Sequence, residues 1–390
     1  MSYDVIVVGA RCAGSPTAML LARRGYKVLA VDRATFPSDT LSTHVIHPPG
    51  IAALARWGLL ERLAATACPA IDTYVFDFGP FAISGSPGAN GAVAYAPRRT
   101  VLDKLLVDAA AAAGAEIREG FSVEELVFED GRVVGLRGHG EHGETVTERA
   151  RGDIGADGRH SSVAHAVGAS SYNEKPPLLC GYYSYWANLP MDGRFETYIR
   201  PNRGFAAAPT HDGLTMVVGG WPYAEFEQRK QDLEASYLAL FDHVPEFAER
   251  IRGATRVARI AGSPVSGYFR TPSGPGWALV GDAGYNKDPI TAQGIQDAFR
   301  DAELVADAVD ASLSGAQPFE IAMESYRRTR DEHVAPMFEL TCMLATLEPP
   351  PPEMQRMLGA IHGKQPLMDA FVQMNAGALS PPQFFAAVAG

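Results

Sequence analysis

A chain of 390 residues, of which 46% are hydrophobic, has material for a sizeable core and length for two or three structural units. Its net charge of −11 argues against nucleic acid or an anionic membrane as the main partner. No apolar run reaches the roughly 18 residues that a membrane span needs. A strand that begins near residue 4 leaves no room for a signal peptide, so we expect a cytoplasmic protein. The four cysteines are scattered and suggest neither a metal site nor a disulfide framework.

The first 33 residues carry the pattern strand, tight turn, helix, strand, acid. Residues 5–8 and 28–31 are continuous apolar runs, which is typical of parallel strands buried on both faces. Residues 18–24 between them carry the apolar face of a helix. Gly9 and Gly14 bracket the turn before that helix. In a dinucleotide-binding βαβ unit, such a turn and the helix N-terminus receive a pyrophosphate group.

Two further residues bear on whether this unit binds a dinucleotide. Asp32 ends the second strand, 23 residues after Gly9, where an acid accepts a hydrogen bond from a ribose hydroxyl. Arg11 stands where the pattern G-x-G-x-x-G has its second glycine, which lets the backbone approach the phosphates closely. Either Arg11 points away, or its guanidinium joins the phosphate site. We predict a dinucleotide site, with a βαβ crossover that binds nothing as the alternative.

A proline-rich loop over residues 34–49 contains two histidines close to the predicted cofactor. Histidine can act as a general base or a hydrogen-bond donor, so His44 is the candidate catalytic residue. A structural hydrogen-bonding role is the alternative for His44, and the stronger one for His47. An amphipathic helix is predicted over residues 51–63.

The next region combines β-structure with one strong helix. Residues 71–83 alternate apolar and polar types and predict a strand or hairpin arm. A helix should follow Arg98 and Arg99, with Thr100 as its N-cap and Gly114 at its C-terminus.

A hairpin is predicted within residues 115–137, because Asp130 and Gly131 separate two alternating apolar runs. Three glycines then repeat the G-x-G-x-x-G spacing, but a charged strand follows them instead of a helix. We therefore interpret them as a hairpin loop and not as a second dinucleotide motif: Gly138, Gly140 and Gly143.

Residues 178–221 predict an antiparallel sheet with an aromatic face, followed by a helical stretch over 223–252 and a strand over 255–269. Successive strand residues face opposite sides, so at most about half of the aromatic residues can line one pocket. The candidates are Tyr74, Phe76, Tyr182, Tyr183, Tyr185, Trp186, Phe205 and Trp221.

A buried strand over residues 278–280 leads into Gly281 and Asp282. A loop with Pro289 follows, and Gln293-Gly294 then opens a long helix over 294–311, whose N-terminus favours negative charge. One more long helix, a proline run and an apolar end complete the chain, and no function is assigned to this tail.

The opening unit with Asp32-Arg33, the Asp157-Gly158 segment and the Gly281-Asp282 segment occur in one order. Together they resemble FAD-dependent monooxygenases of the para-hydroxybenzoate hydroxylase type, and equally the geranylgeranyl reductase-like flavoproteins. The resemblance implies an α/β fold with a Rossmann-like FAD-binding domain (βαβ, GR2-type), an interleaved antiparallel-sheet substrate domain and a helical C-terminal tail. Its predicted divisions are an FAD-binding domain at 1–70, 96–177 and 265–330, a substrate domain at 71–95 and 178–264, and the C-terminal segment at 331–390.

Carried over by position, the resemblance implies which residues hold FAD. Gly9, Ala13 and Gly14 are expected at the pyrophosphate, Asp32 at the adenosine ribose and Arg33 beside the adenine. Arg99 is expected at the flavin, with Arg98 as the fallback, and Asp157 and Gly158 are expected to help hold the FAD. Asp282 is expected at the ribityl or pyrophosphate portion, and Pro289, Gln293 and Gly294 at the isoalloxazine ring, where a helix N-terminus stabilises the negative charge of reduced flavin.

The activity that the resemblance implies is an NAD(P)H- and O₂-dependent monooxygenation through a flavin hydroperoxide. The substrate would be an aromatic, polyketide-like or isoprenoid small molecule that is hydroxylated or epoxidised. Ala164 departs from the family, which usually has arginine there, and puts its mode of nicotinamide binding in doubt. The AQGIQDA segment is closer to the reductases, so a reductase of C=C bonds is the main alternative. A flavin-dependent halogenase, whose W-x-W-x-I-P signature is missing, and a non-catalytic binding protein are weaker alternatives.

Overall fold

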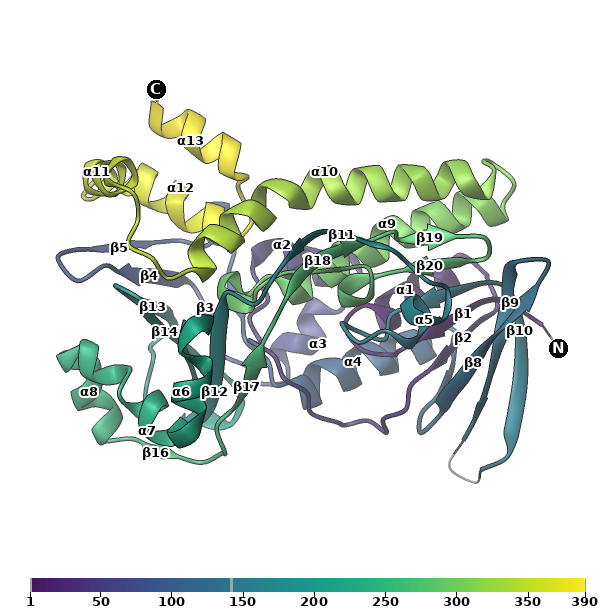
Figure 1. Ribbon diagram of the computed structural model, residues 1–390, viewed down its shortest axis with the longest axis horizontal. Helices are drawn as coiled ribbons and strands as arrows, with labels where there is room; N and C mark the ends of the chain where they lie inside the picture. Colours follow the sequence, from purple (N-terminus) through teal and green to yellow (C-terminus); the bar gives the residue numbers. More distant parts are fainter. Residues whose placement is uncertain (1, 141–142, 390) are drawn as a thin grey trace.

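Two large β-sheets lie at opposite ends of an elongated molecule, and the long helix α10 runs along one side (Figure 1). The computed structural model describes residues 2–140 and 143–389. The architecture is α/β with a helical C-terminus, which confirms the predicted fold class. Within the described residues, no helix combines the length and apolar character needed to cross a membrane.

The first sheet contains the predicted dinucleotide-binding unit. Strand β1 (Tyr3–Val8) pairs in parallel with β2 (Val28–Val31) and with β10 (Thr145–Gly155), and helix α1 (Gly14–Arg23) connects β1 to β2. The strand order is β19-β20-β10-β1-β2-β7, and a hairpin of β8 and β9 extends from β10. The other strands of this sheet are β7 (Glu116–Arg118), β8 (Ser122–Glu129), β9 (Arg132–His139), β19 (Ser273–Gly274) and β20 (Trp277–Leu279).

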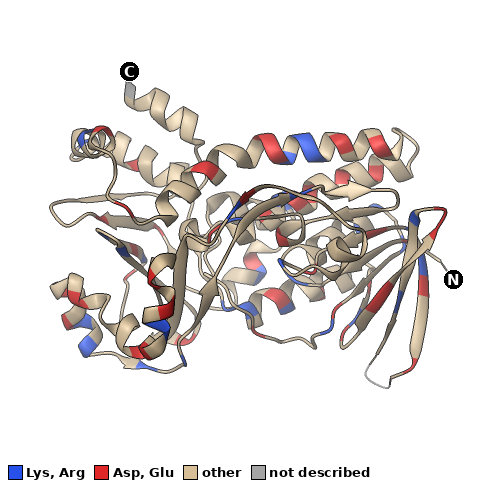
Figure 2. Ribbon diagram, viewed as in Figure 1, with Lys and Arg blue, Asp and Glu red and all other residues tan. Residues whose placement is uncertain are grey.

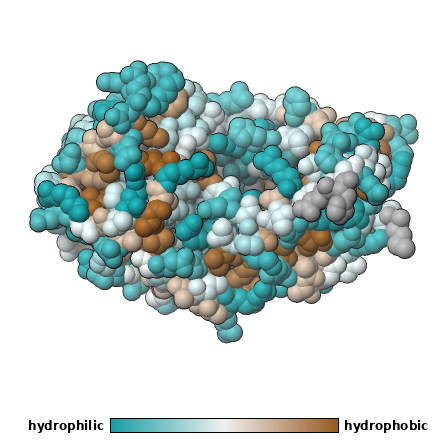
Figure 3. Space-filling view, turned by 90° about the horizontal axis from the view of Figure 1, so that it is seen from below, coloured by the Kyte–Doolittle hydropathy of each residue, from teal (hydrophilic) through white to brown (hydrophobic). Residues whose placement is uncertain are grey.

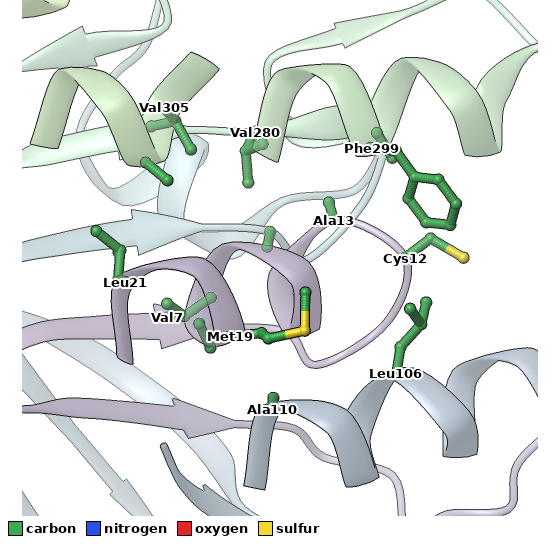
Figure 4. Close-up of a cluster of buried hydrophobic side chains, with 14 of the residues drawn as sticks. Val7, Cys12, Ala13, Met19, Leu21, Leu106, Ala110, Val280, Phe299 and Val305 are labelled. Atoms are coloured by element: carbon green, nitrogen blue, oxygen red, sulfur yellow. The ribbon is translucent and has the colours of Figure 1, made fainter. Parts of the chain in front are cut away.

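The sheet is buried because apolar side chains cover it on both sides. Figure 4 shows one of these layers, in which Val7 of β1 and Met19 of α1 pack with side chains of two more helices, α4 (Arg99–Ala112) and α9 (Gly294–Leu313). Phe299 of α9 closes the layer beside Cys12. Helices α1, α4 and α9 thereby fix the carboxyl end of β1, from which the glycine turn emerges.

The predicted turns of this region are present, with local differences. Asp130 and Gly131 have positive φ angles between β8 and β9, as the hairpin prediction requires. Strands β9 and β10 form the second predicted hairpin, whose tip residues 141 and 142 lie outside the described residues. Helix α4 begins at Arg99 with Arg98 as its N-cap, so the prediction of Thr100 as the cap is wrong by two residues.

The second sheet has the order β16-β12-β15-β14-β13-β4-β5, with β17 also paired to β12. Its neighbours run antiparallel, as predicted, except that β4 and β13 are parallel. Strands from the two sequence segments predicted for the substrate domain thus share one sheet. They are β4 (Thr73–Asp77), β5 (Ala82–Gly85), β12 (Leu179–Ala187), β13 (Arg194–Arg200), β14 (Arg203–Pro209), β15 (Thr215–Pro222), β16 (Thr255–Arg256) and β17 (Ala261–Pro264).

Two predicted elements are broken in the structure. The helix predicted over 51–63 is two helices, α2 (Pro48–Arg56) and α3 (Leu60–Ala64), because Gly58 between them has a φ of 74°, which a helix cannot include. The strand predicted over 255–269 is divided among β16, β17 and β18 (Gly267–Arg270), which belongs to a three-stranded sheet with β11 (Ser171–Lys175) and β21 (Tyr285–Asn286).

The remaining helices and strands are short. Helix α5 (Ser162–Ala166) packs against β8 and β10 of the first sheet. Helices α6 (Phe226–Arg229), α7 (Leu233–Leu238) and α8 (Pro245–Arg252) cover the outer face of the second sheet, and β3 (Ala70–Ile71) and β6 (Ala94–Tyr95) form a separate strand pair. Short 3-10 turns are η1 (Ala89–Gly91), η2 (His211–Gly213), η3 (Tyr223–Glu225), η4 (Lys230–Asp232), η5 (Phe241–His243), η6 (Gly281–Ala283) and η7 (Pro289–Thr291).

The C-terminal part consists of helices that lie over the second sheet at one end of the molecule (Figure 1). Helix α10 (Phe319–Ala345) passes without a break through residue 331, where the C-terminal segment was predicted to begin. After the proline run come α11 (Pro352–Ile361), α12 (Gln365–Asn375) and α13 (Pro381–Ala389). On the face seen in Figure 3, hydrophobic side chains form separate groups between hydrophilic ones.

Candidate functional site

A cavity of about 1030 Å³ extends from the glycine turn of the first sheet to the inner face of the second sheet. Its volume slightly exceeds the roughly 300–1,000 Å³ typical of a site for one small ligand. Most of the residues predicted to bind a cofactor line it: Gly9, Arg11, Ala13, Asp32, Arg33, Arg99, Asp157, Gly158, Asp282, Pro289 and Gly294. Gly14, Gln293 and His44 are not among the described residues that line it.

The two outer glycines of the turn are required by close backbone packing. Gly9 has a φ of 99°, and a Cβ there would lie 2.4 Å from the carbonyl oxygen of Ala156. A Cβ on Gly14 would lie 1.7 Å from the carbonyl oxygen of Gly9. Gly14 therefore shapes the turn from beneath, while Gly9 and Ala13 form its cavity surface.

Asp32 is held at the end of β2 by backbone donors. Its Oδ2 accepts from the amide of Ala10 at 2.8 Å, and its Oδ1 accepts from the amide of Ala34 at 2.8 Å. Each carboxylate oxygen can accept more than one hydrogen bond, so the fixed carboxylate can also accept from a ligand hydroxyl. Arg33, on the cavity wall next to it, is exposed.

Arg11 is engaged with protein groups. Its Nη1 lies 2.6 Å from Oδ2 of Asp103 and 3.2 Å from the carbonyl oxygen of Ser38, and its Nη2 lies 3.0 Å from the Ser38 hydroxyl. The guanidinium carbon also lies 5.2 Å from the centre of the Phe36 ring. These contacts favour the first of the two predicted alternatives, in which Arg11 points away from the phosphates, but Arg11 also lines the cavity, and its role toward a cofactor stays a prediction.

Asp103 on α4 is a charged residue of the site that the sequence reasoning did not single out. Its fully buried carboxylate accepts from Nε and Nη2 of Arg99 at 3.0 and 3.1 Å, as well as from Arg11. The Arg99 guanidinium is thereby fixed on the cavity wall, whereas Arg98 pairs with Asp39 and is not among the described lining residues. The one available signal was the spacing of four residues between Arg99 and Asp103 on a helix.

Asp157 and Asp282 present carboxylates from the ends of two further strands of the first sheet. Oδ2 of Asp157 accepts from the amide and the hydroxyl of Ser162 at 2.7 and 2.8 Å, whereas its Oδ1 is buried without a partner. Asp282 is exposed to the cavity. The loss of hydration among the surrounding protein atoms raises its pKa to about 6, although the positive charge of Arg99 acts in the opposite direction. Gly281, with a φ of 60°, brings this segment against Ala13.

The start of α9 lies beside the cavity and is braced by a buried charge network. The ammonium group of Lys287 lies 2.8 Å from Oδ2 of Asp297 and donates to Oε1 of Gln293 at 2.6 Å. Gln293 therefore supports the helix start, and Gly294 forms its cavity surface. Asp288, which caps η7, has one buried oxygen without a partner, and burial raises its pKa to about 7.

The two loop histidines occupy different positions. His44 is completely buried, and its Nε2 lies 2.5 Å from the hydroxyl of Tyr185. His47 lines the cavity and is joined through Nδ1 to the Tyr74 hydroxyl at 2.6 Å. Burial lowers the pKa of His44 to about 3 and that of His47 to about 4, so both imidazoles are neutral at physiological pH. The catalytic role of His44 stays a prediction.

The second sheet supplies an aromatic cavity wall that follows the expected alternation only in part. Of the eight aromatic candidates, the four that line the cavity are Tyr74, Phe76, Tyr183 and Phe205. Tyr182 and Trp221 stack on each other with ring centres 5.5 Å apart, in a cluster that also contains Trp186 and Phe205, so Phe205 borders the cavity although it packs on the other face of the sheet. Tyr185 packs beside Tyr183 and is not among the described lining residues.

The polar end of the cavity fits FAD. The glycine turn, the ribose-type carboxylate of Asp32 and the unpartnered Oδ1 of Asp157 are the groups that such a dinucleotide needs. Within residues 2–140 and 143–389, no group of histidine, cysteine and acidic side chains is placed to hold a metal ion. The fold and this cavity together define an FAD-dependent oxidoreductase.

The chain belongs to the family described as FAD binding domain, which matches residues 2–341. It is 30% identical over 309 residues to digeranylgeranylglycerophospholipid reductase 2 of Methanopyrus kandleri, covering 76% of this chain and 74% of that protein. It is 28% identical over 382 residues to rifampicin monooxygenase of Streptomyces venezuelae, covering 92% of this chain and 75% of that protein. The solved structure of the flavin-dependent brominase Bmp2 shares the fold, with a TM-score of 0.84, 17% identity and coverage of 100% and 98% of the two chains. The predicted superfamily of FAD-dependent monooxygenases and geranylgeranyl reductase-like proteins is thereby confirmed.

Proposed function

We propose that this flavoprotein is an NAD(P)H- and O₂-dependent monooxygenase that hydroxylates or epoxidises an aromatic, polyketide-like or isoprenoid small molecule. The observation that carries the proposal is that one continuous cavity joins the FAD-fitting residues to an apolar, aromatic wall. Such a site can hold FAD and a second apolar molecule together and exclude water around them. The similarity to rifampicin monooxygenase over 92% of this chain supports the same reaction type.

Each residue at the polar end of the cavity then holds one part of FAD in place. The cofactor supplies the electron transfer and oxygen chemistry when bound. Gly9 and Ala13 receive the pyrophosphate, Asp32 binds the adenosine ribose, and Arg33 lies beside the adenine. Asp157 contributes its free Oδ1 to the same cofactor.

The flavin end is held by groups that the first sheet, α4 and α9 bring together. Arg99, fixed by Asp103, faces the flavin. Asp282 accepts from the ribityl or pyrophosphate portion. The start of α9 at Gly294 and the neighbouring Pro289 border the isoalloxazine ring, where the partial positive charge of a 20-residue helix favours the anionic reduced form. The domain division given above is part of this proposal, with FAD on the first sheet and the substrate on the second.

A reductase of C=C bonds is the second candidate. The observation in its favour is the 30% identity to a digeranylgeranylglycerophospholipid reductase, together with the short AQGIQDA segment at the start of α9. An apolar wall accommodates an isoprenoid chain as readily as an aromatic ring system.

One experiment separates these candidates. The visible spectrum of the purified protein reports bound FAD, and consumption of NAD(P)H is followed with and without O₂ over a panel of aromatic and isoprenoid compounds. We expect a bound flavin and substrate-stimulated, O₂-dependent consumption that yields a product with one added oxygen atom. Substrate reduction under anaerobic conditions without oxygen insertion would establish the reductase instead. A protein that takes up no FAD would eliminate both.

A further inference from the structure

The chain beyond the family match closes the part of the cavity that the second sheet lines. This part is called here the apolar half. The match ends at residue 341, and residues 346–388, called here the C-terminal cap, comprise α11, α12, most of α13 and the segments between them. Cap side chains that line the cavity include Leu347, Met354, Met357, Leu358, Phe371 and Met374. One wall of the cavity therefore comes from a segment that the family does not specify.

The cap is docked on the second sheet and is not a loose tail. The ring of Phe371 packs edge-on against Phe76 with ring centres 5.3 Å apart, and Phe384 packs behind it at 5.9 Å. Asp369 accepts from the backbone amide of Ser86 at 3.0 Å, after the end of β5. This docking fixes the position of the cap side chains relative to the aromatic wall.

Among the described lining residues, the cap offers no cation to a bound anion. Among the described lining residues on the second sheet and after residue 339, Glu348 is the only one with a charged side chain. Helix α13 carries no charged residue at all (Figure 2). The lining cations come from elsewhere: Arg11, Arg33, Arg99, Arg159 and Lys287. Arg159, next to Gly158, also reaches the edge of the second sheet, where its Nη2 donates to the Ser263 hydroxyl at 3.1 Å. An anionic group buried against the cap would lose hydration without gaining a cationic partner, which is strongly unfavourable.

We propose that the C-terminal cap is the substrate-recognition element of this chain and selects a large, uncharged, apolar molecule over a carboxylated or sulfonated one. The proposal rests on the proposed function in that it assigns the apolar half to the substrate. Methionine side chains of the cap, Met354, Met357 and Met374, are flexible and polarisable and adapt to a polycyclic or branched apolar shape.

The test uses two probes with one skeleton, N-phenyl-1-naphthylamine and its sulfonate, 8-anilino-1-naphthalenesulfonate. Both are titrated by fluorescence into the FAD-loaded protein, so that the cationic half is already filled. We expect the uncharged probe to bind at least about tenfold more tightly, because the sulfonate has no cation to pair with. Equal affinities, or tighter binding of the sulfonate, would overturn the selection for uncharged ligands.

Variants of α11 test the role of the cap. Met357→Glu places a charge on the cavity wall and should weaken the uncharged probe at least about tenfold. Arg356→Glu, at an exposed position of the same helix outside the lining, should leave its affinity unchanged. The FAD spectrum and the unfolding temperature report folding, and Met357→Gln is the milder replacement if the glutamate variant fails to fold. Unchanged affinity in a folded Met357 variant would overturn the assignment. Because probe binding needs no turnover, these outcomes are distinct from a failure to bind FAD or to consume NAD(P)H with O₂.

Discussion

The residue in place of the second motif glycine gives the sharpest prediction: Arg11→Gly, which completes the pattern G-x-G-x-x-G, should leave FAD binding almost unchanged. In the structure the Arg11 guanidinium donates hydrogen bonds of 2.6 to 3.2 Å to the Asp103 carboxylate and to the carbonyl and hydroxyl oxygens of Ser38. It connects the turn after β1 to α4 and to the loop after β2. On this basis Arg11 acts as a brace between three segments and not as a phosphate ligand.

The magnitudes of the two alternatives differ enough to be separated. A guanidinium on the FAD phosphates would contribute a charge-assisted hydrogen bond of about 1.5–3 kcal/mol, and its removal would weaken FAD by roughly 10- to 150-fold. For a brace, the change in FAD affinity should stay below about threefold, while the free energy of unfolding falls by about 1–3 kcal/mol. The loss of stability is bounded because Asp103 retains two hydrogen bonds from Arg99.

The assay is a titration of the FAD-depleted protein with FAD by flavin fluorescence, beside urea unfolding of the same samples. Arg11→Lys is the matched control, because it keeps the charge and loses the planar fork that matches a carboxylate. If Arg11→Gly weakens FAD by tenfold or more and Arg11→Lys restores the affinity, the brace interpretation is refuted and the guanidinium has replaced the glycine at the phosphates.

Three other predictions address separate parts of the molecule. Asp32→Ala and Asp282→Ala should each abolish stable FAD binding in the same titration, and an unchanged affinity in either would remove that residue from the cofactor site. His44→Ala should slow turnover while FAD stays bound, because Tyr185, which packs against the cavity-lining Tyr183, loses the hydrogen bond that holds it; unimpaired turnover would leave His44 with a purely structural role. Asp153 is fully buried with both oxygens unpartnered, and burial raises its pKa from 3.8 to about 8. The folded state then binds a proton that the unfolded state releases above about pH 4, so stability falls as the pH rises from about 4 to 8, by up to about 4 kcal/mol at pH 7. Asp153→Asn should make the stability less dependent on pH, and it should raise the unfolding temperature at pH 8 more than at pH 5. Equal changes in unfolding temperature at the two pH values would contradict the raised pKa of Asp153.

The sequence was sufficient for features whose determinants are local. The βαβ unit depends on two apolar runs, on the positive φ of Gly9 and on the close contact of Gly14 with Gly9, all of which lie within one short stretch of sequence. The aromatic wall followed from the alternation of strand side chains, which divides Tyr183 from Tyr182 whatever the surrounding fold. Both inferences used a periodicity that the backbone itself imposes.

Features set by tertiary contacts could not be predicted. Asp103 pairs with Arg11 across 92 residues, and its spacing of four residues from Arg99 does not by itself distinguish it from a solvated acid. The two histidines of the loop are three residues apart, yet His47 lines the cavity and His44 does not, since the loop has no repeating geometry. The apolar residues of the C-terminal end show no clear helical spacing, because the cap packs on the second sheet with one side and lines the cavity with another.

The start of α9 links the two halves of the cavity physically. Gly294 borders the cavity there, and Gln293 holds Lys287 through its Oε1 while its Nε2 donates to the carbonyl oxygen of Asn375 in the cap at 3.0 Å. One turn later, Gln296 donates to the carbonyl oxygen of Ala376. A ligand that shifts the C-terminal end of α12 must therefore also shift the side chains that brace the helix start. If FAD lies at this helix start and the substrate against the cap, occupation of the apolar half acts directly on the electrostatic environment of the flavin.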